Sequence, residues 1–391
     1  MARRPSAEEP EAPPPEPDRA EPWPHPRHTL RLHGQARAER AFLEARASGR
    51  LPHAWLLTGP KGVGKATLAW RIARTMLAEP AEAGGGLLGG GEAAAPDTLE
   101  MTPEHPVFRR VASLGEARLR LLRRGWDAKA KRLRTRIVAE DARGLRTLFE
   151  RSAADGGWRV AVVDSVDEAN PQAANALLKL IEEPPPRSLF LLVSHAPSRL
   201  LPTIRSRCRR LALDPLGPEA LAAAAAEARA AAGAEDAPVG PALAALSEGS
   251  VGEALRLSTL GGEALYADLV GMMAGAPGMD RSRWHGWAEA AGGRAGEARL
   301  EATLRLTALL AQRLARAGAS GRAPAPEAAP GEAALAARLS PSPAAARLWA
   351  EAATTLPARA AADRAVNLDP DRIVLDTFAA LDAVARRAAA A

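Results

Sequence analysis

The stretch "TGPKGVGKATLAW", residues 58–70, has the spacing of a phosphate-binding loop between a strand and a helix. Four residues separate Gly59 from Gly64, and Lys65 follows directly. The glycines let successive backbone N–H groups curve around phosphate oxygens, the helix N-terminus adds partial positive charge, and the lysine reaches the outer phosphates. A chance glycine turn is the less favoured alternative. The predicted cofactor-binding residues in this loop are Gly59, Gly62, Gly64, Lys65, Ala66 and Thr67.

The residue after the lysine departs from the usual pattern. A Ser or Thr hydroxyl normally ligates Mg²⁺ at this position, but the chain has Ala66. Thr67 is one residue on, about 100° around the helix, so its hydroxyl points elsewhere. We therefore expect Mg²⁺ binding to be weak or absent.

The carboxylate that should accompany the loop is Asp164, at the end of the apolar run "VAVVD". ATPases of this class usually follow that Asp with a Glu that orients the attacking water, whereas here Ser165 follows. An alternative takes Asp167 and Glu168 as the acidic pair, but it requires an interrupted strand, "VVDSV". Two groups needed for hydrolysis are missing, so we predict that the chain's own ATPase activity is absent or very weak.

Apolar runs and helical patterns alternate around this loop. "AWLLTG", "WRVAVVDSV" and "SLFLLVSHAP" are predicted to be buried strands, and "TIRSRCRRLAL" leads to a fourth. "NPQAANALLKLIEEPPP" is predicted to be a helix that three prolines end. Such alternation indicates a parallel α/β sheet covered on both faces. After Pro218 the strand signals vanish and the pattern is helical.

These patterns predict four successive regions. We expect a disordered Pro/Glu-rich tail, which buries too little apolar surface to order itself, then an α/β domain with a flexible Gly-rich insert, a small helical domain and a C-terminal helical domain. Their predicted ranges are 1–27, 28–216 with the insert near 82–96, 217–261 and 262–391.

Composition narrows the partners and cofactors. The single cysteine, Cys208, excludes an internal disulfide and a multi-cysteine zinc site, and it fits a reducing cytoplasm. The seven histidines show no paired spacing of the usual zinc-binding kind, so we expect no bound zinc. No apolar run is long enough to predict a transmembrane helix, so we expect no membrane partner and a cytoplasmic location. The net charge of +6 allows an acidic partner such as DNA.

An arginine-dense stretch covers residues 109–136. It holds eleven Lys and Arg residues against two acidic ones, Glu116 and Asp127. We favour a solvated helical face over a contact with DNA or another partner, and both interpretations stay open.

Two long motifs carry a resemblance to a known family. "NALLKLIEEPP" (residues 175–185) and "LFLLVSHAPSRLLPTIRSRC" (residues 189–208) resemble the clamp-loader branch of the AAA+ ATPases. The match looks closest to the delta-prime subunits of bacterial DNA polymerase III. The resemblance runs from about residue 33 to residue 216 and is less clear in the intervening insert.

The resemblance implies an AAA+ P-loop module, a small helical lid and a C-terminal helical collar that joins subunits into a five-membered ring. It implies gamma/tau-type and delta-type subunits, the sliding clamp and primer-template DNA as partners within the DNA polymerase III holoenzyme. It also implies that the arginine of the triplet Ser206, Arg207, Cys208 reaches the ATP of the neighbouring subunit. A planar arginine cation stabilises the charge that develops on a transferring phosphoryl group. Arg205 and Arg209 are adjacent alternatives.

The chain differs from active members of the family beyond Ala66 and Ser165. In "SEGSVGEALRL", Gly252 stands where the lid arginine is expected, although Arg256 is near. The sensing position at the end of a strand falls at Ser194 or His195. We therefore expect a hydrolysis-deficient subunit that supplies Arg207 to its neighbour. The alternatives are an active gamma/tau-type ATPase and a small-molecule kinase, and the residues leave open whether ATP still binds.

Overall fold

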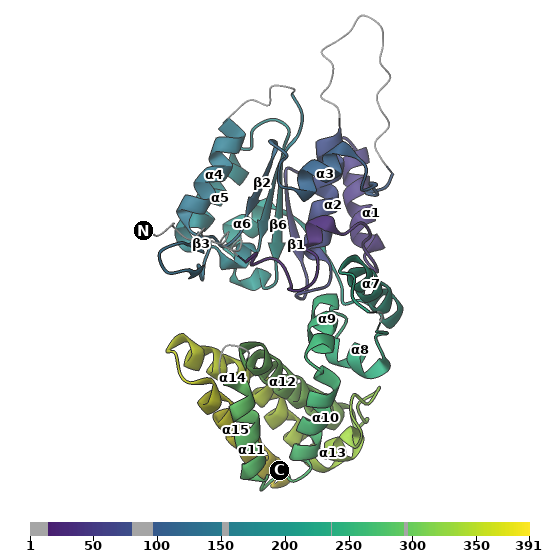
Figure 1. Ribbon diagram of the computed structural model, residues 1–391, viewed down its shortest axis with the longest axis vertical. Coiled ribbons are helices and arrows are strands. Elements are labelled where there is room, and N and C mark those ends of the chain that lie inside the picture. The colour runs from purple at the N-terminus through teal and green to yellow at the C-terminus, as the bar shows by residue number, and fades with distance from the viewer. Residues whose placement is uncertain (1–14, 80–96, 151–155, 236, 293–295) are drawn as a thin grey trace, which may run out of the picture. The chain divides into compact units, whose positions relative to one another are not determined.

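The chain forms two compact units in a computed structural model (Figure 1), which describes residues 15–79, 97–150, 156–235, 237–292 and 296–391. The first unit holds the residues up to Leu216 together with residues 226–235. The second holds residues 217–225 and the described residues from 237 onward. The Gly-rich insert predicted near residues 82–96 lies outside the described residues.

A five-stranded parallel sheet forms the centre of the first unit. Its strand order is β2-β5-β6-β1-β7. The strands are β1 (Ala54–Thr58), β2 (Leu119–Leu122), β5 (Arg159–Asp164), β6 (Ser188–Ser194) and β7 (Arg209–Ala212). Every residue of β1, β5 and β6 is buried, which explains why these segments are continuous apolar runs in the sequence. The predicted parallel sheet is confirmed.

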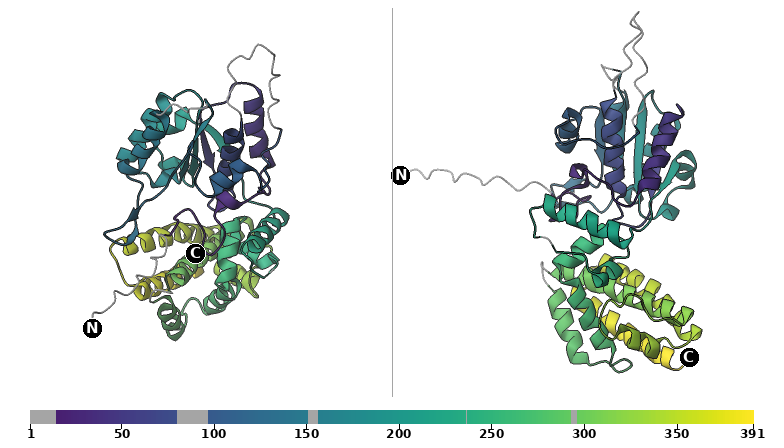
Figure 2. Two further views of the ribbon diagram at one scale, coloured as in Figure 1. Left: turned by 45° about the horizontal axis from the view of Figure 1, so that its top comes forward. Right: turned by 90° about the vertical axis from the view of Figure 1, so that its right-hand side faces the viewer.

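Helices cover both faces of this sheet, as predicted (Figures 1 and 2). Helices α4, α5 and α6 share a core with the sheet on one face, and α1 to α3 lie on the other (Figure 1). The helices are α1 (Ala36–Ala47), α2 (Lys65–Ala78), α3 (Pro106–Ala112), α4 (Ala139–Glu150), α5 (Pro171–Glu182) and α6 (Pro202–Arg207), with 3₁₀ turns η1 (Pro26–His28), η2 (Val166–Glu168) and η3 (Pro197–Arg199).

The arginine-dense stretch 109–136 is not a helical face, so the favoured interpretation of it is wrong. Only its first residues belong to a helix, α3; the rest forms β2 and a two-stranded hairpin of β3 (Trp126–Asp127) and β4 (Arg132–Leu133). β2 lies at the edge of the sheet, and only its first and last residues, Leu119 and Leu122, are buried. The strand was not predicted from the sequence, because the exposed Arg120 interrupts its apolar run.

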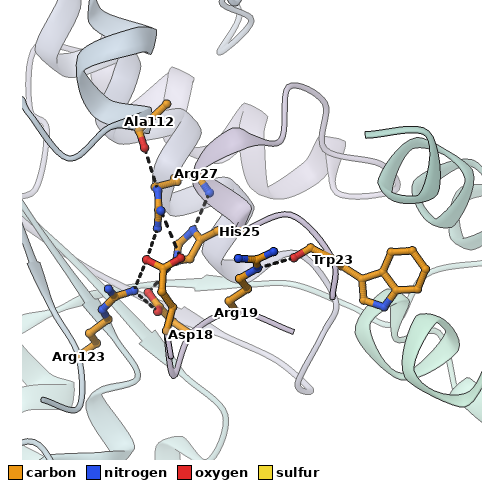
Figure 3. A network of polar contacts seen from close by, with 8 residues as sticks. Asp18, Arg19, Trp23, His25, Arg27, Ala112 and Arg123 are labelled. Atoms are coloured by element: carbon orange, nitrogen blue, oxygen red, sulfur yellow. Dashed lines mark hydrogen bonds and ion pairs between the residues drawn. The ribbon is translucent and has the colours of Figure 1, made fainter. Parts of the chain in front are cut away.

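The predicted disordered tail is also wrong for the part that the structure describes. Residues 1–14 lie outside the described residues, but residues 15–27 pack against the α/β unit (Figure 3). Trp23 and His25 are buried, and the His25 ring meets the Trp70 ring of α2 edge-on with centroids 5.7 Å apart.

Charged groups anchor this N-terminal segment. Asp18 and His25 are 2.9 Å apart and almost fully buried. Arg27 forms an ion pair with Glu16 at 2.6 Å and donates from Nε to the carbonyl of Ala112 at 2.9 Å (Figure 3). The prediction counted apolar residues, whereas polar contacts with residues far along the chain hold the segment in place.

The second unit is helical, as predicted. Its helices are α8 (Pro241–Ser247), α9 (Val251–Thr259), α10 (Gly262–Met273), α11 (Arg281–Ala291), α12 (Gly296–Ser320), α13 (Glu332–Leu339), α14 (Pro343–Ala365) and α15 (Pro370–Ala389); α7 (Pro218–Ala231) contributes residues to both units. Leucines of α8 and α9 belong to the same core as the later helices. The division into a lid (217–261) and a collar (262–391) therefore stays a prediction.

A buried ion pair joins two helices of this unit. The guanidinium of Arg313 contacts both carboxylate oxygens of Glu332, with Nη2 at 2.9 Å from Oε2. Glu332 also accepts hydrogen bonds from the Tyr266 hydroxyl at 2.7 Å and from the Ala328 N–H at 2.7 Å. Burial alone would raise the pKa of Glu332, but the hydrogen bonds from Arg313 and Ala328 outweigh it and lower that pKa.

Glu332→Gln should destabilise the helical unit by about 3 kcal/mol at neutral pH, because it leaves the buried Arg313 cation without a counter-charge. A carboxylate with a lowered pKa stabilises the fold above its unfolded pKa, and this contribution is lost as the pH falls through the folded value. The difference between wild type and variant should therefore shrink in acid. Denaturant unfolding at several pH values measures it.

Glu351→Gln is the matched control, because it removes the same charge from an exposed position of α14. Equal, small effects of the two substitutions at neutral pH would show that the buried pair adds no stability.

Candidate functional site

The segment predicted to bind phosphate forms the turn between β1 and α2. Gly59, Gly62 and Gly64 all have positive φ, of 145°, 81° and 101°. At Gly59 a Cβ would lie 2.3 Å from the carbonyl oxygen of Leu213, so a larger residue has no room. Gly64 is the N-cap of α2, which places the amino end of that helix at the loop. The turn thus has the glycine geometry that the sequence predicted.

Lys65 is the first residue of α2, and its ammonium group is held by the loop itself. Its Nζ donates to the carbonyl of Gly59 at 2.6 Å and to that of Pro60. Burial lowers the pKa of Lys65 to about 8, against the attraction of Asp164 and Asp167. The lysine therefore lies in the same electrostatic site as the two carboxylates.

Ala66 and Thr67 follow in the first turn of α2, and both are partly buried. The Ala66 methyl group has no oxygen with which to ligate a metal ion. The backbone at this position is that of an ordinary first helical turn, so the difference from a metal-binding loop lies in the side chain.

Asp164 is the last residue of β5 and is buried. Burial, reinforced by the negative charge of Asp18, raises the pKa of Asp164 to about 7, against the attraction of Lys65. The N-terminal segment thus places a second carboxylate within electrostatic reach of the position where a metal-side Asp was predicted. Sequence analysis missed Asp18, because nothing local indicates that residue 18 lies beside residue 164.

Asp167 connects the ends of two neighbouring strands. It lies in η2, just after β5, and accepts a hydrogen bond from the Ser194 hydroxyl at 2.7 Å. Its other oxygen accepts from the backbone N–H groups of His195 and Ala196, the latter at 3.3 Å. The alternative with Asp167 at the end of an extended strand is wrong, because β5 ends at Asp164.

Ser165, between these carboxylates, is buried and precedes the first residue of η2. It directly follows Asp164, where the sequence analysis expected a water-orienting Glu in an active ATPase. Glu168, which follows Asp167, forms an ion pair with Arg124 at 2.9 Å.

Arg207 ends α6 and its side chain is 41% exposed. It forms an ion pair with Glu182, at the end of α5, with Nη2 and Oε1 2.9 Å apart. The Glu182 side chain is itself 37% exposed. Sequence analysis missed this partner, although Glu182 lies in one of the two motifs that carry the family resemblance. Arg205, the adjacent alternative, is also exposed.

The residues predicted near a lid motif lie in the other unit. Arg256 of α9 forms an ion pair with Glu253, one turn earlier in the same helix, at 2.7 Å. Gly252 is the second residue of that helix.

Within the ranges that the structure describes, no three His, Cys, Asp or Glu side chains are grouped closely enough to hold a metal ion. None of the described helices combines the length and the apolar character needed to cross a bilayer.

Comparison with known proteins gives matches in the α/β unit. Residues 34–217, just under half of the chain, match the family model described as "DNA polymerase III, delta subunit". The DNA polymerase III subunit delta' of Pseudomonas aeruginosa is 35% identical over 156 residues, which are 40% of this chain and 41% of the relative. The subunit delta' of Bacillus subtilis is 27% identical over 48% of this chain and 50% of the relative.

A subunit of another type also matches. The DNA polymerase III subunit tau of Escherichia coli is 31% identical over 186 residues, which are 48% of this chain and 25% of the relative. The matched region thus spans at most half the length of each of these three relatives.

The matched region contains the loop between β1 and α2, Asp164 and Arg207, and it folds as the five-stranded parallel sheet with its covering helices; the helices from α7 onward follow it. The α/β unit of the chain is therefore similar to the delta' subunits of DNA polymerase III and to the family model described as "DNA polymerase III, delta subunit".

Proposed function

We propose that the chain acts as a delta-prime-like subunit of the bacterial DNA polymerase III clamp loader, which places the sliding clamp on primed DNA. In this proposal the chain does not hydrolyse ATP itself. It joins gamma/tau-type and delta-type subunits in a five-membered ring and supplies Arg207 to the ATP site of a neighbour. It holds no zinc, and any ATP that it binds stays intact.

The observation that carries the proposal is the contrast between the loop and the groups around it. The three glycines keep the turn of a phosphate loop and Lys65 lies inside it. Ala66 lacks the Mg²⁺-ligating hydroxyl, and Ser165 stands in place of the water-orienting acid. The geometry for holding phosphates is present without the side chains that activate them.

The surroundings of Arg207 support its role in trans. Its cation is exposed, so it needs no rearrangement of a packed core to reach another chain. Its ion pair with Glu182 is also exposed, and such pairs contribute about 0–1 kcal/mol. A phosphate group of a neighbour's nucleotide, with its greater charge and bidentate geometry, competes well for the guanidinium.

An active gamma/tau-type ATPase is the second candidate, and the match to a tau subunit favours it. The same two positions separate the candidates, because a motor needs a metal ligand after Lys65 and an acid after Asp164. Ala66 and Ser165 favour the delta-prime-like role.

The isolated chain should hydrolyse ATP negligibly. Its turnover number should lie far below roughly 1 s⁻¹, the lower end of typical kcat values for enzymes. Phosphate release from purified chain measures this, with Lys65→Ala as the control for contaminating ATPase. The double change Ala66→Thr with Ser165→Glu should restore little, because no neighbouring arginine is present. Turnover near 1 s⁻¹ that Lys65→Ala abolishes would favour the motor.

Arg207→Ala should leave the fold and the assembly of the ring nearly unchanged, because exposed substitutions usually alter stability by about 0.5 kcal/mol or less. Hydrolysis at the one neighbouring site should fall by on the order of 10³-fold or more. Steady-state hydrolysis by the whole ring should fall less, since its other sites keep their own arginines. The measurement is DNA- and clamp-stimulated ATPase, with clamp loading, in reconstituted rings.

Arg205→Ala is the control, because it removes an exposed arginine two residues away. Arg207→Lys should behave like Arg207→Ala, since lysine keeps the charge but loses the planar fork. Normal clamp loading by Arg207→Ala rings would refute the role in trans.

A further inference from the structure

β3 and β4, with two residues each, form a short hairpin in the arginine-dense stretch; β3 is labelled in Figure 1. The strands are antiparallel, with Trp126 opposite Leu133 and Asp127 opposite Arg132. The Asp127 carboxylate accepts hydrogen bonds from the N–H groups of Lys129 and Ala130, both at 3.0 Å, and so shapes the turn. The single acidic side chain of the hairpin is thus used by its own backbone.

The cations at the base of the hairpin are neutralised within the chain. Arg123 forms an ion pair with Glu16 at 3.0 Å and another with Asp18 (Figure 3). Arg124 pairs with Glu168 at 2.9 Å. After β4, the Arg134 guanidinium forms an ion pair with Asp141 at 3.4 Å. The backbone N–H of Arg134 donates a hydrogen bond to the carbonyl of Gly125 at 2.9 Å. These contacts fix the base of the hairpin on the α/β unit.

Four other cations of the stretch differ from those at the base. Lys129 and Lys131 lie in the turn, Arg132 lies in β4 and Arg136 follows the hairpin, and all four are exposed. Among the described residues, none of these four forms an ion pair with a carboxylate. Asp127 lies opposite Arg132, and its charge interacts with that cation. The four like charges within eight residues nevertheless repel one another. Such a cluster is suited to a polyanionic partner.

We propose that the β3–β4 hairpin binds the sugar-phosphate backbone of duplex DNA. The major groove of B-DNA admits a two-stranded β-ribbon, and cations beside such a ribbon meet the phosphates on either side. This inference goes beyond the supply of Arg207 to a neighbour and does not depend on it. It assigns a DNA-contacting surface to the chain itself.

Two observations favour duplex DNA over single-stranded nucleic acid and over a protein partner. Trp126, 37% exposed, is the sole aromatic residue of the hairpin, whereas surfaces that bind single strands usually stack successive bases on several rings. Lysines, two of the four cations, are depleted at protein–protein interfaces, whose centres are apolar. Apart from Trp126, the described residues of the hairpin include no exposed large hydrophobic side chain that would form such a centre.

Binding of the full chain to a short fluorescein-labelled duplex tests the proposal by anisotropy at increasing salt. The triple variant Lys129→Gln, Lys131→Gln, Arg132→Gln should bind at least about tenfold more weakly at low salt. Its slope of log affinity against log salt should be shallower than that of wild type by roughly 2 to 3, because about 0.9 counterion is released per neutralised phosphate.

Two control variants separate the hairpin from net charge. Arg347→Gln, Arg372→Gln, Arg387→Gln removes three exposed cations from the helical unit and should leave the slope nearly unchanged. Lys129→Arg, Lys131→Arg, Arg132→Lys keeps the charges of the hairpin and should bind like wild type.

Three results would overturn the proposal. One is the absence of duplex binding by wild type at low salt. Another is an equal loss of affinity in both glutamine variants, which would assign binding to net charge. The third is hairpin-dependent binding that favours single-stranded over duplex DNA. These measurements use no ATP, so they are independent of the hydrolysis and arginine experiments.

Discussion

The parallel register of β1, β5 and β6 is the constraint on which the candidate site depends. Thr58 pairs with Ser194, and Asp164 pairs with Val193. The carboxyl ends of all three strands therefore lie at the same end of the sheet. Each strand is buried throughout, so a shift in register would move apolar residues at one end of the strand out of the core and is disfavoured. The loop after β1, Asp164 and Ser194 therefore lie at the same end of the sheet without being close in sequence. Asp167, which follows β5, accepts a hydrogen bond from Ser194 and so connects the carboxyl ends of β5 and β6.

Local sequence was sufficient wherever one segment determines its own structure. The glycine spacing predicted a loop between a strand and a helix, and the apolar runs predicted β1, β5 and β6. Sequence analysis failed where distant residues decide the outcome. The segment 15–27 is ordered by pairs such as Asp18 with His25 and Arg27 with Glu16, which composition does not reveal. Arginines likewise hid the edge strand β2, and no local pattern predicted the ion pair between Glu182 and Arg207.

The electrostatics of the site agree with its proposed loss of chemistry. Burial and the charge of Asp18 raise the pKa of Asp164 to about 7, against the attraction of Lys65. Ala66 has no side-chain oxygen that could ligate a metal ion. The proposed DNA-binding hairpin and Arg207 would then be the parts through which the chain acts on other molecules.

The affinity of the isolated chain for ATP, measured by calorimetry with Mg²⁺ and with EDTA, tests the central claim most directly. The claim is that the loop keeps a phosphate-binding shape without a functional metal site. It predicts that Mg²⁺ changes the affinity little, and that any binding is lost in Lys65→Ala. Binding that tightens tenfold or more with Mg²⁺, and that depends on Asp164, would show a working metal site and contradict the claim.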